Sequence, residues 1–227
     1  MTFSLTKNSI NENQEEIEVE VGTYAFAKLI RKQEGGRKII NGLVNINSLS
    51  TEMPEEGVKL SAEFSEVNLE SINSLLSSIP GNSIITDANI NIKEFNVYGY
   101  VISNANIKFA PTNENISVQI LSNDASGNIL WNQKENLLKA GFEKLPLKKD
   151  NTHAENERNF IFSNPPKINI KVNSLALDDE IYGDLSLLAS KENKIWNIEN
   201  FKISNPNHII KGSGLWDDEG LNPNTSI

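Results

Sequence analysis

The chain has 227 residues, of which 38% are hydrophobic and 7% aromatic, and it carries a formal net charge of -9. This acidic balance argues against a nucleic-acid partner, because phosphate binding is driven by clustered lysine and arginine side chains. The sequence has no cysteine, which excludes disulfides, thiolate metal ligands and a thiol nucleophile.

The first part of the chain reads as strands separated by turn residues. Residues 39–46 and 58–67 alternate between apolar and polar side chains, which is the period of a half-buried strand. Residues 21–38 fit either a strand or a short amphipathic segment. The period then changes, and apolar residues recur at helical spacing behind Asn68, which suits an N-cap. We therefore expect a short helix near residues 68–79.

Strands resume near Asp87 and continue to about Leu147. Residues 148–164 are charged and polar, with too few apolar side chains to offset the backbone entropy of ordering them, about 1 to 2 kcal/mol per residue. We expect residues 1–147 to form a β-meander with the short helix, residues 148–164 to form a flexible polar loop, and residues 165–227 to form a second meander that continues the same sheet.

The segment from Pro165 to Trp216 carries the clearest pattern, with short alternating strands and little between them. Successive side chains of a strand leave from opposite faces, so Ile168 and Ile170 share one face while Asn169 points to the other. Each run is bounded by Asn, Asp, Gly or Pro, the residues of turns. The sequence thus predicts a mostly β protein with one apolar sheet face, on which we place Val58, Leu60, Phe64, Ile90, Ile92, Ile168, Ile170, Val172, Leu185, Leu187 and Ile198.

Few side chains in the sequence suggest chemistry. His153 and His208 lack spaced ligand partners, and we expect both to be exposed surface residues. The acidic run at 178–180 could hold a hard cation, although a solvated turn is the favoured interpretation. No nucleophile–base pair or Gly-rich phosphate loop is present, so we expect no catalytic residue, no metal and no cofactor. The tryptophans either line a ligand site or cap the core at strand ends, and the sequence leaves this open for Trp131, Trp196 and Trp216.

Two stretches share a pattern with a known family. Residues 41–76 combine a strand with a glycine start, a proline turn, an alternating strand and a short helix. Residues 165–216 combine a proline-led strand, a Tyr-Gly turn, a Trp-Ile strand, a Ser-Asn-Pro turn and a closing Gly-x-Gly-x-Trp. In this order and spacing the chain resembles the AsmA-like envelope proteins of Gram-negative bacteria, of the YhdP type. The helix departs from the family pattern at Ile72, where a tryptophan is usual.

The resemblance implies an elongated antiparallel sheet, strongly curved like a folded taco, with one or two short helices. It also implies a periplasmic location, with an inner-membrane anchor and an outer-membrane contact supplied by other parts of the chain. No run approaches the roughly 18 apolar residues of a membrane helix. We therefore expect this sequence to be a piece of a longer protein and to contain no transmembrane segment.

The resemblance further implies that the partner is the acyl part of phospholipids, carried between the inner and outer membranes in a groove lined by the apolar residues named above. A two-chain lipid has about 30 methylenes, whose exposure to water costs on the order of 24 kcal/mol. A carrier must shield nearly all of them, and a one-sided sheet can do so without enzymatic chemistry. The alternative is a structural or adhesive surface β-protein with a closed core and no ligand, which an open apolar groove would distinguish.

Overall fold

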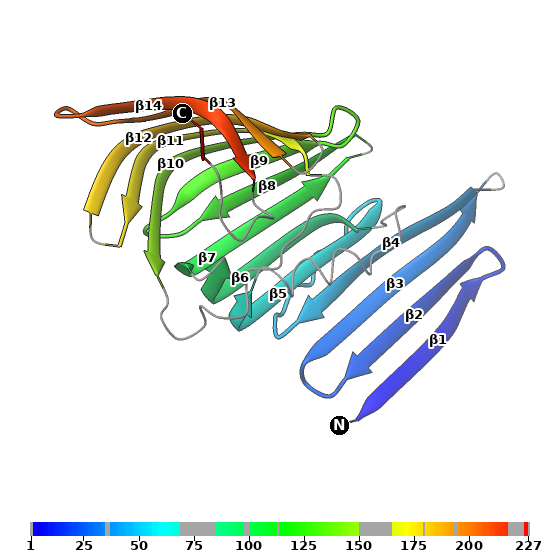
Figure 1. The fold of residues 1–227 in the computed structure, drawn as a ribbon. Helices are drawn as coiled ribbons and strands as arrows, with labels where there is room; N and C mark the ends of the chain where they lie inside the picture. Colours follow the sequence, from blue (N-terminus) through cyan, green and yellow to red (C-terminus); the bar gives the residue numbers. More distant parts are fainter. Residues whose placement is uncertain are drawn as a thin grey trace.

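The computed structural model describes residues 2–34, 37–68, 85–97, 100–112, 114–149, 165–178, 180–192, 195–217 and 225–226. They form a single open sheet of 15 strands, in which the strands lie side by side in chain order (Figure 1). The strands are β1 (Phe3–Asn11), β2 (Gln14–Val21), β3 (Ala25–Glu34), β4 (Arg37–Ile46), β5 (Gly57–Asn68), β6 (Ile85–Val97), β7 (Tyr100–Pro111), β8 (Asn115–Leu121), β9 (Ser126–Asn132), β10 (Leu137–Lys149), β11 (Lys167–Leu177), β12 (Glu180–Glu192), β13 (Ile195–Ser204), β14 (Ile209–Asp217) and β15 (Thr225–Ser226).

The expected mostly β fold is confirmed, and the described residues contain no helix. Residues 21–38, which the sequence left as either a strand or a short amphipathic segment, contain the strand β3. The helix predicted near 68–79 lies outside the described residues except for Asn68, which is the last residue of β5. Of the polar loop predicted at 148–164, residues 148 and 149 belong to β10, and residues 150–164 lie outside the described residues.

The sheet departs from the expected antiparallel arrangement at three places, because β4–β5, β5–β6 and β10–β11 are parallel pairs. A parallel pair needs a connection that returns the chain to the same end of the sheet. Between β4 and β5 this connection is residues 47–56. It is tied to the sheet by the Asn45 side-chain amide, which donates to the Ser50 carbonyl oxygen at 2.8 Å, and by the ion pair between Lys59 and Glu52.

The sheet curls around the short hairpin β8–β9. These strands have seven residues each, whereas β7 has 12 and β10 has 13. The longer strands extend past the hairpin and pair directly with each other, with Val101 opposite Lys148 and Tyr100 opposite Lys149. Figure 1 shows the resulting curvature, with β10 to β14 turned relative to β1 to β5.

The hydrophobic core lies inside this curl. Its buried members come from β6, β7 and β8 and the turn after β8, and side chains from β9 and β10 pack against them. Both Ile92 and Phe95 are buried although they are three positions apart, so the alternation on β6 shifts by one position between them. In this region of β7, Asn104 has a φ of 51° and has no partner in the register of the two strands. The cluster comprises Ile92, Phe95, Ile102, Ala105, Ile107, Ile120 and Ala125.

Candidate functional site: the apolar face of the sheet

The strand register brings apolar residues of fourteen strands into unbroken rows on one face, which we call the apolar face. Residues paired across neighbouring strands point to the same side, so a row can be followed from strand to strand. One row from β1 to β14 consists of Leu5, Val19, Ala27, Val44, Leu60, Ala88, Phe109, Val118, Ile129, Ala140, Ile170, Leu187, Phe201 and Gly212.

A second row lies two residues further along each strand and is also free of polar side chains. It consists of Phe3, Val21, Ala25, Ile46, Ala62, Ile90, Ile107, Ile120, Gly127, Phe142, Val172, Leu185, Ile203 and Ile210. Fourteen strands at a spacing of about 4.8 Å make a continuous apolar strip of about 60 Å, measured along the curved sheet.

The opposite side of the sheet, which we call the polar face, has the inverse character. Its central row is polar in every strand except at Phe26 and Gly141. It consists of Ser4, Glu20, Phe26, Asn45, Ser61, Asn89, Lys108, Gln119, Asn128, Gly141, Lys171, Ser186, Lys202 and Lys211. The two faces therefore differ along the whole length of the sheet, and not only in single strands.

The structure brings all of the predicted groove residues to the apolar face. Six of them belong to the two rows above, three to each row, and the others lie beside these rows on the same face: Phe64 is paired with Ile92, Val58 precedes Leu60 by two positions, and Ile168 connects to Ile198 through Ala189. Their role as lipid ligands stays a prediction, since the register establishes their common face and no bound molecule is involved.

Exposure along the apolar face rises from the middle of the sheet to its two ends. In the middle, Val58 and Ile92 are 2% exposed and Val172 is 1% exposed. At the ends, Phe3 on β1 is 67% exposed and Ile210 on β14 is 58% exposed. The curl buries the central part of the face among its own side chains, whereas the flanks present apolar side chains to solvent.

Charged groups on the polar face are paired across strands. The Lys28 ammonium lies 2.9 Å from a carboxylate oxygen of Glu16 and 2.9 Å from one of Glu18. Hydrogen bonds to these two carboxylates raise the pKa of Lys28 above its ordinary value. Similarly, the hydrogen bond between Lys59 and Glu52 raises the pKa of the lysine and lowers that of the carboxyl. These ion pairs stabilise charge on the polar face, which also exposes the apolar side chains of Leu121, Leu130 and Ile209.

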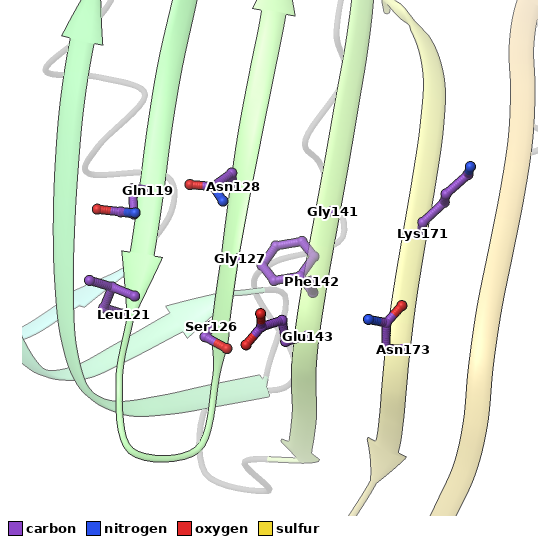
Figure 2. Close-up of a pocket in the computed structure, with 10 residues that line it drawn as sticks. All are labelled: Gln119, Leu121, Ser126, Gly127, Asn128, Gly141, Phe142, Glu143, Lys171 and Asn173. Atoms are coloured by element: carbon purple, nitrogen blue, oxygen red, sulfur yellow. The ribbon is translucent and has the colours of Figure 1, made fainter.

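A shallow depression on the polar face surrounds Gly141, where the missing side chain leaves a gap in the polar row (Figure 2). Amide, ammonium and carboxylate groups border it, contributed by Asn128, Lys171 and Glu143 among others. The depression is open, lies on the face opposite the apolar rows, and is also bordered by Leu121.

Of the residues that the sequence suggested for other chemistry, those that the structure describes lie in or next to exposed turns. His208 is exposed, and its backbone N–H donates to the Asn205 side-chain oxygen in a turn. Glu180 accepts a hydrogen bond from the Tyr182 hydroxyl, which raises the pKa of Tyr182. No group of three potential metal ligands occurs among the described residues, and His153 and Asp179 lie outside them.

Sequence reasoning missed the N-terminal part of the apolar face. Leu5 and Val19 belong to its rows, but they alternate with Ser, Thr and Glu in a stretch whose charge masks the pattern. The signal was the strict period of two in residues 16–21, where Glu16, Glu18 and Glu20 alternate with apolar residues.

An open, curled sheet with one continuous apolar face defines the class of single-sheet amphipathic β-proteins. The family model described as "YhdP protein" matches residues 1–227, so the chain belongs to the YhdP family. Membership supports an AsmA-like protein of the cell envelope, of a lipid-transport type. Comparison with curated proteins and with solved structures found no match. None of the described residues belongs to a helix with the length and hydropathy needed to cross a bilayer.

Proposed function

We propose that this chain is a segment of a periplasmic protein whose apolar face shields phospholipid acyl chains during transport between the inner and outer membranes. The observation that carries this proposal is the pair of unbroken apolar rows across fourteen strands, backed by a polar row one residue away. A large apolar surface that stays partly exposed on a soluble sheet indicates a binding function.

The energetics favour acyl chains as the ligand. Each buried methylene contributes about 0.8 kcal/mol, so a strip of apolar side chains stabilises a tail in proportion to the length that it covers. The flanks β1 to β3 and β12 to β14 supply this surface, since their apolar side chains are the more exposed ones. The central strands, whose side chains fill the curl themselves, supply the rigid support that holds both flanks.

The same proposal assigns the protein no catalytic activity and no cofactor. Its partners are phospholipids, and the anchor in the inner membrane and the contact with the outer membrane belong to other parts of the full-length protein. Apolar side chains are exposed near both ends of the sheet, on β1 and on β14.

Two glycines provide a matched test. A Cβ added at Gly212 on the apolar face would meet no atom within 4 Å, and the same is true of Gly141 on the polar face. Neither glycine has a positive φ, so leucine fits the backbone at both positions. We expect Gly212→Leu to reduce binding of a fluorescent phospholipid, because the new side chain fills the surface on which a tail would lie, and Gly141→Leu to leave binding unchanged.

Binding would be measured by fluorescence titration and by native mass spectrometry of protein purified from membranes. Circular dichroism establishes that both variants are folded. Equal binding by the two variants, or a wild-type chain that neither retains nor takes up lipid, contradicts the proposal.

A structural or adhesive β-protein is the second candidate, and the burial of Val58, Ile92 and Val172 favours it. In that case the apolar face is a core whose flanks are covered by protein. An environment-sensitive apolar dye distinguishes the two: a lipid-binding face takes up the dye at the β12 to β14 flank and Gly212→Leu reduces the signal, whereas a closed core gives no signal in either protein.

A further inference from the structure

All three tryptophans of the chain lie on the apolar face at the same end of the strands. Trp131 is the penultimate residue of β9 and is paired with Leu138 at the start of β10. Trp196, the second residue of β13, is paired with Trp216, the penultimate residue of β14. Because β9 and β14 run opposite to β10 and β13, the three indoles share one edge of the face.

Cations occupy the same edge. Lys191, near the end of β12, is paired with Trp196, and its ammonium lies 5.8 Å from the centre of that ring system. On β1 and β3, Lys7 and Arg31 converge on a single carboxylate, that of Glu15, which the Lys7 ammonium approaches to 2.7 Å. We call the set Lys7, Arg31, Trp131, Lys191, Trp196 and Trp216 the tryptophan lip.

The other ends of the strands are different in chemistry. They carry tyrosines, with Tyr24 in the turn before β3 and Tyr100 as the first residue of β7. They also carry the carboxylates Glu66 and Glu94, which are paired in register near the ends of β5 and β6. The two edges of the apolar face therefore differ, with indoles and cations at one and tyrosines and a pair of carboxylates at the other.

We propose that Lys7 and Arg31, the cations of the tryptophan lip on β1 and β3, bind the phosphate of a lipid whose acyl chains lie on the apolar face. This inference rests on the proposed function and specifies which edge of the face receives the polar end of the ligand. Lys7 and Arg31 are 62% and 44% exposed, and together they carry one positive charge more than Glu15 neutralises. Arginine and lysine retain further N–H donors for phosphate oxygens.

The indoles fit the boundary that such a ligand creates. Tryptophan prefers positions where one side is apolar and the other is wet, because its ring is apolar and its N–H is a donor. The Trp131 indole nitrogen is buried and has no acceptor in the described part of the chain. Apolar side chains lie two residues inside each cation, Leu5 on β1 and Leu29 on β3, which is about 7 Å along the strand. One amphiphile can therefore contact both.

The test compares phosphatidic acid with diacylglycerol of the same chains, since the two differ only in the phosphate. The variant Lys7→Gln/Arg31→Gln removes two cations from the lip, and the control Lys171→Gln/Lys202→Gln removes two from the polar row. We expect the lip variant to bind phosphatidic acid about tenfold more weakly and diacylglycerol within about twofold of wild type. The control should bind both lipids as wild type does, and Glu15→Gln should bind phosphatidic acid more tightly.

Each outcome separates this inference from the proposed function. Equal weakening by the lip variant and the polar-face control shows a net-charge effect and overturns the inference. If both lipids bind alike and no variant changes this, the lip inference is wrong while lipid binding stands. If neither lipid binds, both proposals are wrong. Displacement of phosphatidic acid by an equal concentration of inorganic phosphate would show a free-phosphate site and likewise overturn the inference.

Discussion

Gly127 on β9 is paired with Phe142 on β10, and the structure predicts the sign of the coupling energy between substitutions at these two positions. Gly127 is buried on the apolar face between Ile120 and Phe142, and a Cβ added to it would overlap three atoms of the Phe142 ring. The ring is held by the core of the curl, so it cannot move away freely. We expect Gly127→Ala to lower the free energy of unfolding by about 2 kcal/mol, the usual cost of overpacking.

In a protein that lacks the Phe142 ring, Gly127→Ala should raise the free energy of unfolding instead of lowering it. Phe142→Ala alone removes a partly buried aromatic side chain and costs about 3 kcal/mol. In that background the methyl group at position 127 has space, and alanine in a strand is more stable than glycine by about 0.5 to 1 kcal/mol. The double-mutant cycle should therefore give a coupling energy of roughly 2.5 to 3 kcal/mol between the two positions.

Urea unfolding at 25 °C, followed by far-ultraviolet circular dichroism and by tryptophan fluorescence, measures these differences. The two signals must give coincident transitions with an unchanged dependence on urea, since a long single sheet can unfold in parts. Gly141→Ala is the control, because its new Cβ meets nothing within 4 Å. The reasoning is refuted if Gly127→Ala is neutral in the wild-type background, or if it costs as much when Phe142 is absent.

Two further predictions concern a strained glycine and an ion pair. Gly183→Ala should destabilise the protein by about 2 to 4 kcal/mol in the same assay, because Gly183 has a φ of 94° and its Cβ would overlap the Ser204 carbonyl oxygen. Gly22→Ala, at a φ of 55° but with only the Tyr24 ring nearby, should cost about 1 kcal/mol, and equal losses would contradict this ranking. In a carboxyl NMR titration Glu52 should have a pKa below its ordinary value, and Lys59→Gln should restore that value. Because the pKa of Glu52 is lower in the folded state, the ion pair stabilises the protein above the ordinary carboxyl pKa, and this stabilisation is lost as the pH falls through the pKa of the folded state. If Lys59→Gln leaves the Glu52 pKa unchanged, the hydrogen bond from Lys59 is not the cause of the lowered pKa.

Local patterns were enough to predict the strands and their two-sided character. The alternation of Ile168, Ile170 and Val172 with polar residues has a period of two, which is a property of the extended backbone itself. It placed these side chains on one face without any knowledge of neighbouring strands. The same local logic failed to select Leu5 and Val19, because their strands lie among charged residues.

The remaining features depend on pairing between residues that are distant in the chain. Register and curvature determine three such features. Strand β5 pairs with β4 in parallel, Gly127 lies against Phe142, and Val58 in the middle of the sheet is buried whereas Phe3 at its end is exposed. These depend on which backbone groups close hydrogen bonds across strands, and local sequence does not encode that choice.

The sequence by itself determined that the chain forms strands with one apolar and one polar side. The tertiary structure decided that these sides join into continuous rows, that the curl buries the middle and leaves the flanks exposed, and that the tryptophans lie along one edge. The physical reason is that side-chain alternation is fixed within each strand, whereas alignment between strands is fixed only when all of the pairings form together.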